Sequence, residues 1–199
     1  IEREWMPVPE RHQFIATHNA KVLLDHGFTG AFSGGATRPA IEVALRDEIK
    51  AGFVPGPRLI ASSFERNASG ERLEFGPQIE EAKRFVQDMI DLGVDSMKMV
   101  LDGRGATVVD KWHIINYGDK ELEVISQMAH EAGVYLSCHS YQPEALKLAV
   151  KHDFHIIYHA NFADEETIDL IESKKDTLFV GPCIGVLFAD AYDRFPTRE

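Results

Sequence analysis

The stretch "YLSCHSYQPEALKLAVKHDFHIIYHA" (residues 135–160) holds two short apolar runs, each of which leads into a histidine. His139 follows the first run and His159 follows the second, and a segment with helical spacing separates them. Apolar runs of this length favour strands, so the stretch predicts a strand, a helix and a second, parallel strand. The two histidines would then stand at the same end of neighbouring strands.

The same alternation recurs along most of the chain. Strands are expected at residues 28–33, 58–63, 96–101, 134–139, 155–159 and 177–183. Amphipathic helices are expected at residues 78–92, 120–132, 143–152 and 165–173. Proline near the start and glycine just past the end agree with several of these helix boundaries. Strands that alternate with helices predict an α/β fold with a parallel sheet and right-handed crossovers.

The two faces of three successive strands bear on whether the sheet is open or closed. Side chains alternate between faces along a strand, so each strand divides into two sets. One set is apolar and is expected under the helices: Met97, Met99, Leu101, Val134, Leu136, Cys138, Ile156 and Tyr158. The opposite set carries the polar side chains: Ser96, Lys98, Val100, Tyr135, Ser137, His139, His155, Ile157 and His159.

A polar face argues against an open doubly wound sheet, because helices cover both faces of such a sheet. It fits a (β/α)8 TIM-type barrel, in which functional groups stand at the carboxyl ends of the strands. We therefore predict such a barrel, with about six of its eight strands in this chain. His155, at the amino end of its strand, is expected to fill the barrel interior.

Six strands are two too few to close a barrel of eight. Residues 1–199 are therefore expected to be the central part of a single barrel, with the first strand and the last strand or strands missing from the segment. The strands at 28–33 and 177–183 would otherwise be unpaired edges that favour association. The remainder of the same barrel is therefore an expected partner. The edges and the acidic surface also favour a homo-oligomer.

The composition excludes several classes of protein. With 44% hydrophobic and 27% charged residues, the 199-residue chain is globular and long enough for one core. Its net charge of −11 disfavours a nucleic-acid partner, because phosphates would be repelled. No apolar run approaches the roughly 20 residues that a membrane span needs. Cys138 and Cys183 form no CxxC motif, so a cytoplasmic location is the default expectation.

Two neutral imidazoles at adjacent strand ends can converge on one cation, which makes His139 and His159 candidate metal ligands. The alternative is that each ring is buried and hydrogen-bonded for structural reasons. Lys98 is the second unusual residue, because lysine is rarely buried without a partner. Its structural role would be an interior ion pair or a stem that reaches to the surface. Its functional roles would be a carbamate that bridges two metals or a Schiff-base nucleophile.

Loops that follow the strands are expected to set specificity. Candidate substrate-binding residues on them are His113, Tyr117, Tyr141 and Asn161. The loop expected after residue 63 carries Phe64, Arg66 and Asn67. Ordinary loop packing is the alternative role for the aromatic side chains.

Five stretches of the sequence, in order, resemble the metal-dependent amidohydrolase superfamily, and the similarity is greatest to its imidazolonepropionase and prolidase-like members. These stretches are "LLDHGFTGAFSGG" (23–35), "LRDEIKAGFVPGPRLIAS" (45–62), "GVDSMKMVLDG" (93–103), "MAHEAGVYLSCHSY" (128–141) and "DFHIIYHANFADEETIDLI" (153–171). The resemblance covers about residues 20–185. It implies a (β/α)8 barrel with one or two divalent ions, zinc first and manganese, cobalt or iron as alternatives.

Carried over to this chain, the resemblance implies that His139 and His159 are metal ligands and that Lys98 is a carboxylated lysine bridging two metals. The family also has a His-x-His pair on its first strand and an aspartate on its eighth, and neither is in this sequence. The segment alone is therefore expected to be inactive.

The chemistry that the resemblance implies is hydrolysis of an amide, urea or carbamate-like C–N bond of a small molecule by metal-activated water. Two other hypotheses stay open. One is a Schiff-base lyase or aldolase barrel that uses Lys98, and the other is a non-catalytic barrel scaffold.

Overall fold

The computed structural model describes residues 7–67, 78–103 and 114–185. Its helices are α1 (Pro9–Asp25), α2 (Pro39–Lys50), α3 (Ile79–Leu92), α4 (Asp119–Glu131), α5 (Pro143–Lys151) and α6 (Glu165–Glu172). Its strands are β1 (Gly30–Phe32), β2 (Arg58–Ile60), β3 (Ser62–Asn67), β4 (Ser96–Val100), β5 (Tyr135–Ser140), β6 (Ile156–His159) and β7 (Phe179–Gly181). Among these residues no helix is long and apolar enough to cross a membrane.

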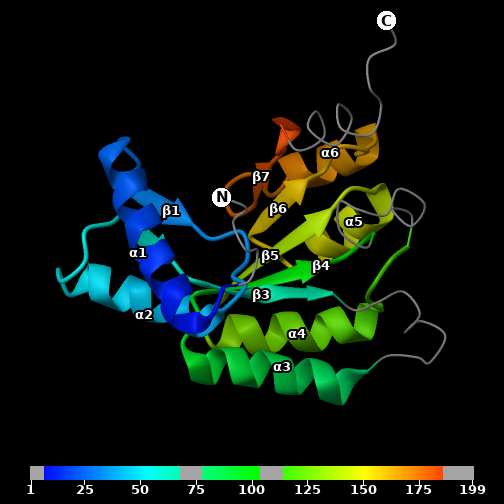
Figure 1. Cartoon of the computed structure of the whole chain (residues 1–199). Coiled ribbons are helices and arrows are strands. Elements are labelled where there is room, and N and C mark those ends of the chain that lie inside the picture. The colour runs from blue at the N-terminus through cyan, green and yellow to red at the C-terminus, as the bar shows by residue number, and fades with distance from the viewer. Residues whose placement is uncertain (1–6, 68–77, 104–113, 186–199) are drawn as a thin grey trace, which may run out of the picture.

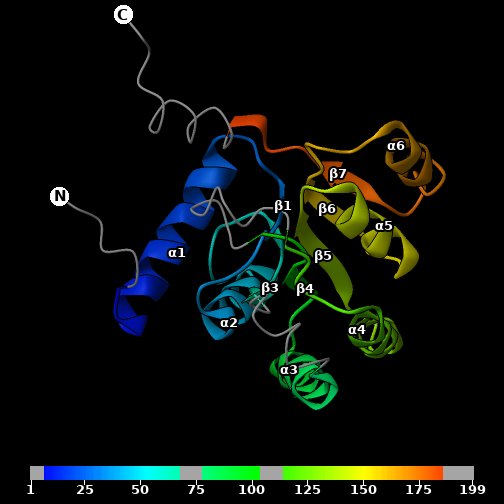
Figure 2. The same ribbon diagram turned by 90° about the vertical axis from the view of Figure 1, so that its right-hand side faces the viewer.

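The strands of the described residues form two sheets, and every pairing is parallel. One sheet has the order β1–β2, and the other has the order β3–β4–β5–β6–β7. Figures 1 and 2 show α3 to α6 lying along the outer side of the larger sheet, with α1 and α2 beside the smaller one. The α/β class, the parallel strands and the four predicted helices are confirmed. Closure into a barrel is not seen among the described residues.

The strand predicted at residues 58–63 is in fact two strands. β2 pairs with β1, whereas β3 pairs with β4 and has an irregular register between Ser62 and Glu65. The chain passes from one sheet to the other at Ala61, the single residue between β2 and β3. β3 also continues through Asn67, so the prediction that Phe64, Arg66 and Asn67 lie in a loop was wrong.

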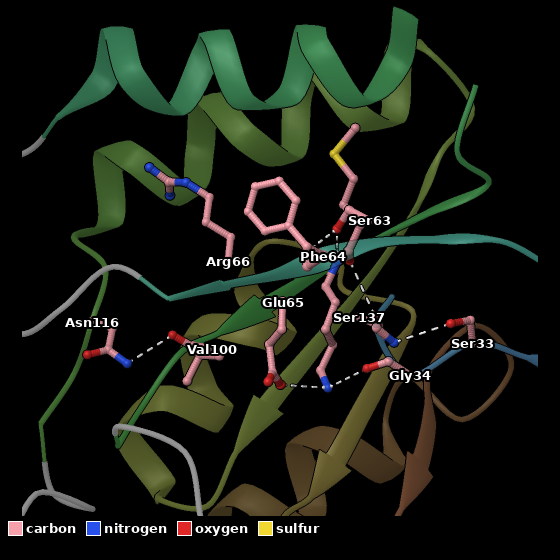
Figure 3. A network of polar contacts seen from close by, with 12 residues as sticks. Ser33, Gly34, Ser63, Phe64, Glu65, Arg66, Val100, Asn116 and Ser137 are labelled. Atoms are coloured by element: carbon pink, nitrogen blue, oxygen red, sulfur yellow. Dashed lines mark hydrogen bonds and ion pairs between the residues drawn. The ribbon is translucent and has the colours of Figure 1, made fainter. Parts of the chain in front are cut away.

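Arg66 explains why β3 was underestimated. Its guanidinium carbon lies 5.4 and 5.3 Å from the ring centroids of Phe85 and Tyr117. Figure 3 shows the Arg66 side chain on the helix side of the sheet. A charged side chain is typical of a surface loop, yet that of Arg66 is only 5% exposed. A stacked guanidinium can be buried in this way when aromatic rings cover both of its faces.

The hydrophobic core lies between the larger sheet and its helices. The outer faces of β4 and β5 contribute Met97, Met99, Leu136 and Cys138, as predicted, and all four are fully buried. α3, α4 and α5 pack against them through residues that include Val86, Leu122, Ile125 and Leu146. Burying a side chain of this size stabilises the fold by roughly 1.5–3 kcal/mol, so this layer fixes the sheet on which the candidate site stands.

The faces of β6 are the reverse of the prediction. Ile157 is fully buried in the core under the helices, although it was expected on the inner face. Tyr158 pairs in register with His139 and lies beneath Lys98, although it was expected under the helices. The prediction failed because it assumed that regular alternation continues as far as His159.

Candidate metal centre

His139 and His159 lie side by side at the carboxyl ends of β5 and β6. Their ring centroids are 4.5 Å apart and the rings are inclined at 72°. The register pairs His139 with Tyr158 and Ser140 with His159, so regular alternation would place the two histidines on opposite faces. The backbone instead leaves the strand conformation at His159, which has a φ of +84°, and Ala160 follows at +54°.

This left-handed backbone lets the His159 ring lie beside the His139 ring. Non-glycine residues with such φ values are uncommon, and each costs of the order of 1–3 kcal/mol. Strain of this kind persists where the surrounding structure holds it, and it clusters at functional sites. Two such residues in succession make the end of β6 the strained point of the site.

Two of the imidazole nitrogens have no hydrogen-bond partner among the described residues. They are Nε2 of His139 and Nδ1 of His159, and both atoms are buried. Burial lowers the pKa of His139 to about 3, with further contributions from the nearby His159 and Lys98. Burial likewise lowers the pKa of His159 to about 4, and the Lys98 charge adds to the effect.

Both rings are therefore neutral near pH 7, which is the state in which imidazole binds a metal. Buried polar atoms are nearly always paired, so a cation between the rings would supply what these two nitrogens lack. The residues thus fit a metal ion. Among the described residues, no group of three or more His, Cys, Asp or Glu side chains is placed to hold one, so the histidine pair offers only part of a ligand set.

Lys98 stands on the inner face of β4, and its side-chain nitrogen has three partners. Its Nζ donates to the carbonyl oxygen of Gly34 at 2.9 Å and lies 3.1 Å from Oε1 of Glu65. It also lies 4.4 Å from the centroid of the Tyr158 ring. Figure 3 shows the contacts that reach Glu65 and Gly34. The ion pair considered from the sequence is present, although the Glu65 side chain is 48% exposed. Lys98 pairs in register with Ser137, which lies two residues before His139 on the same face of β5.

The loop after β1 closes over Lys98. Gly35 has a φ of +130°, and a Cβ at this position would lie 3.5 Å from Cγ of Lys98. Ala36 donates to the carbonyl of Ser63, which ties the loop to β3. Glycine at position 35 is therefore favoured by its left-handed backbone, whereas the distance to Lys98 is an ordinary van der Waals contact.

Tyr141 packs against both histidines. Its ring centroid lies 4.7 Å from that of His139, edge to face, and 4.6 Å from that of His159, nearly stacked. Phe162 lies on the Tyr141 ring at 6.1 Å. The side chain that was predicted to contact substrate thus forms a wall of the site and holds the two imidazoles.

The other candidate substrate residues are placed differently. Asn161 follows the strained end of β6, and its buried Oδ1 has no partner within the described ranges. Tyr117 is buried in the hydrophobic core, and its hydroxyl donates to the carbonyl of Arg66 at 2.9 Å. This gives Tyr117 a packing role on the helix side of the sheet. His113 lies outside the described residues.

Sequence reasoning missed Asp102, which lies just past β4. The carboxylate is fully buried and accepts hydrogen bonds from the main chain of Tyr141 and Gln142. Burial raises its pKa to about 6, although these hydrogen bonds act in the opposite direction. An acidic residue directly after an apolar strand was the signal available in the sequence.

Comparison with solved structures shows which proteins share this fold. No family model matches the sequence, and no curated protein is similar to it. Among solved structures, a Xaa-Pro dipeptidase with bound methionine superposes with a TM-score of 0.82 at 20% identity, over 98% of this chain and 52% of that one. An amidohydrolase gives 0.76 at 21% identity, over 97% and 52%. This chain therefore shares its fold with these two solved structures.

A putative prolidase from Bifidobacterium longum has a TM-score of 0.68 at 27% identity, over 81% of this chain and 40% of its own. The resemblance to the amidohydrolase superfamily inferred from the sequence is therefore confirmed. The chain spans about half the length of the solved structures that it matches.

Proposed function

We propose that this chain belongs to a metal-dependent hydrolase that cleaves an amide, urea or carbamate-like C–N bond of a small molecule. The observation that carries the proposal is the pair of buried imidazoles at adjacent strand ends. Nε2 of His139 and Nδ1 of His159 have no hydrogen-bond partner in the described part of the chain, and their rings are 4.5 Å apart. The dipeptidase, amidohydrolase and prolidase with this fold support the reaction class.

We also propose that residues 1–199 are the central part of a (β/α)8 barrel completed by strands outside the segment. β1 pairs only with β2, and β7 pairs only with β6, among the strands described. Each therefore has an edge that a further strand could cover. The match to only about half of each solved chain supports the same conclusion.

His139 and His159 would hold the metal, with zinc as the first candidate because neutral imidazole suits it. When bound, the metal supplies a Lewis acid that polarises the scissile carbonyl and activates water. Lys98 is the candidate third group on the inner face, as the carbamate that the resemblance implies. When Lys98 is not carboxylated, its Nζ contacts Glu65 and Gly34 on the inner face of the sheet.

The remaining residues of the site would bind and orient the substrate. Oδ1 of Asn161 is a buried acceptor with no partner among the residues described, so it would take a hydrogen bond from a substrate N–H. Tyr141 and Phe162 form an aromatic wall beside the histidines. Such a wall excludes water from one side of the reacting bond and favours a partly apolar substrate.

The test uses the full-length protein and a set of X-Pro dipeptides and N-acyl amino acids. We expect hydrolysis that a chelator abolishes and that added zinc restores. Activity that resists chelation, with borohydride trapping of substrate on Lys98, would instead establish the Schiff-base alternative. The scaffold alternative would stand if the metal-loaded protein neither bound nor hydrolysed any member of the set.

A further inference from the structure

The Asp102 carboxylate serves one short segment of the chain. Its Oδ2 accepts hydrogen bonds from the main-chain N–H of Gln142 at 2.7 Å and of Tyr141 at 2.8 Å. Its Oδ1 is 3.0 Å from the same Tyr141 nitrogen, and the Ser140 hydroxyl donates to Oδ2 at 3.4 Å. All these donors lie in the connection from β5 to α5. Asp102 makes no ion pair with any described residue, so its role there is to accept hydrogen bonds.

The segment that Asp102 holds is the one that joins the ends of three strands. The main chain of Leu101 donates to the carbonyl of His139 at 2.9 Å, which ties β4 to β5. The carbonyl of Tyr141 accepts from Phe162 at 3.1 Å, and that of Ser140 accepts from Ala160 at 2.9 Å, which ties β5 to the end of β6. Tyr141 is thus fixed through its backbone from both sides.

The ring of Tyr141 transmits this fixation to the histidines, because it packs against both imidazoles at 4.7 and 4.6 Å. The hydrogen bonds of Asp102 reach this chain segment and neither imidazole. We propose that Asp102 is a positioning residue of the candidate metal centre: it fixes the backbone of Tyr141, and the Tyr141 ring keeps His139 and His159 oriented toward a common cation. This inference rests on the proposed function.

A carboxylate suits this position for a local reason. Tyr141 and Gln142 immediately precede α5, and Gln142 is its N-terminal cap residue. The N–H of Gln142 lies at the N-terminus of this helix, where the helix dipole favours a negative charge, and the N–H of Tyr141 directly precedes it. Alanine at position 102 would leave these buried donors unpaired. Asparagine could keep the two shortest bonds, because both converge on one oxygen.

The experiment measures zinc affinity of the full-length protein by equilibrium dialysis and the environment of the metal by the visible absorption of bound Co²⁺. We expect Asp102→Ala to weaken zinc binding 10- to 100-fold, the range seen when groups that orient metal ligands are removed, and to shift the Co²⁺ band. Asp102→Asn is expected to stay within about threefold of the wild type, because the main acceptor is retained.

Glu121→Ala provides a matched control. The Glu121 carboxylate is also buried and also accepts main-chain hydrogen bonds, from Gln78 and Gly118, but it lies on α4. This variant should lose thermal stability yet keep wild-type zinc affinity and the wild-type Co²⁺ spectrum. A loss of affinity as large as that of Asp102→Ala would show a general effect of destabilisation and overturn the inference.

A double-mutant cycle tests the route through Tyr141. If Asp102 acts through that ring, Asp102→Ala and Tyr141→Ala together should weaken zinc binding no more than the larger single effect, whereas independent effects would add. Asp102→Ser replaces Asp102→Ala if the alanine variant does not fold. The inference would be overturned if a folded Asp102 variant that lacks the hydrogen bonds to Tyr141 and Gln142 bound zinc as tightly as the wild type. If the wild type bound neither zinc nor cobalt, the proposed function would be refuted instead.

Discussion

Two histidine pairs lie at opposite ends of β5 and β6, and they differ in what their nitrogens contact. At the carboxyl end, the rings of His139 and His159 are 4.5 Å apart and inclined at 72°. At the amino end, the rings of His130 and His155 are 5.5 Å apart and inclined at 80°. Ring geometry alone barely distinguishes the two pairs.

The nitrogen atoms distinguish them clearly. At the amino end, Nδ1 of His155 accepts from the main chain of Leu136 at 3.1 Å, and Nε2 of His130 lies 3.2 Å from the carbonyl of Asp153. These two histidines line a cavity of about 440 Å³, so His155 does not simply fill an interior as predicted. At the carboxyl end, Nε2 of His139 and Nδ1 of His159 find no partner within the described residues.

The comparison shows that two neighbouring histidines do not make a metal site by themselves. A lone pair that already accepts a backbone hydrogen bond is not available to a cation without breaking that bond. The lysines near the two histidine pairs, Lys98 and Lys174, also differ in their surroundings. Lys98 is buried beside the first pair, whereas Lys174 lies near the second pair in a half-exposed ion pair with Asp153.

The largest expected effect separates the two pairs directly. His139→Ala combined with His159→Ala should abolish zinc binding by the full-length protein, because both candidate imidazole ligands are removed. His130→Ala combined with His155→Ala should retain it. Elemental analysis after dialysis measures the zinc content of each. Equal zinc content in the two double variants would show that the carboxyl-end pair is not the metal centre.

The next effect concerns the two lysines. Lys98→Met should lower kcat/KM of the full-length protein about 100-fold or more, because it removes the charged group beside His139 and His159. That loss corresponds to about 3 kcal/mol of transition-state stabilisation. Lys174→Met is the control at the amino end and should stay within about twofold. Comparable losses in both variants, measured on one substrate, would remove any special role for Lys98.

The third prediction concerns pH and stability of the metal-free protein. Because burial raises the pKa of Asp102 from 3.8 to about 6, the folded state holds this proton more tightly than the unfolded state does. The stability that the protonated Asp102 carboxyl contributes is therefore fully present below pH 3.8 and is lost as pH rises through 6. Relative to Asp102→Asn, the free energy of unfolding of the wild type should fall by about 3 kcal/mol over this range.

Urea unfolding at pH 4, 5, 6 and 7 measures this difference. Asp119 serves as the control of opposite sign, because hydrogen bonds from Lys151 and His152 lower its pKa. Stability that depends on Asp119 should decrease as pH falls through its lowered pKa. A constant difference between wild type and Asp102→Asn from pH 4 to 7 would contradict the assignment of a raised pKa to Asp102.

The smallest expected effect lies at the amino end. His155→Phe removes the acceptor of the Leu136 amide, so the free energy of unfolding should fall by about 1 kcal/mol, the usual net value of a hydrogen bond. Zinc content and kcat/KM should not change. A loss of zinc in this variant, measured alongside its unfolding curve, would mean that the two ends of the strands are coupled.

Periodicity in the sequence determined the order and type of most elements. The apolar spacing in 78–92, 120–132 and 143–152 predicted α3, α4 and α5 to within a residue at each end. It also predicted that His139 and His159 stand at the carboxyl ends of adjacent parallel strands. These features are local, because strand and helix spacing and the residues that end a helix act over a few positions along the chain.

Only the tertiary structure decided which side chains meet. It divided residues 58–67 between two sheets, reversed the faces of β6 and turned the His159 backbone left-handed so that the imidazoles lie together. It also placed the Asp102 carboxylate under Tyr141 and Gln142, nearly 40 residues further along the chain. The partner of a buried polar atom depends on segments distant in sequence, whereas propensity and periodicity are properties of neighbouring residues. The sequence therefore indicated the two histidines as candidate ligands. It could not show that two of their nitrogens have no hydrogen-bond partner within the described residues.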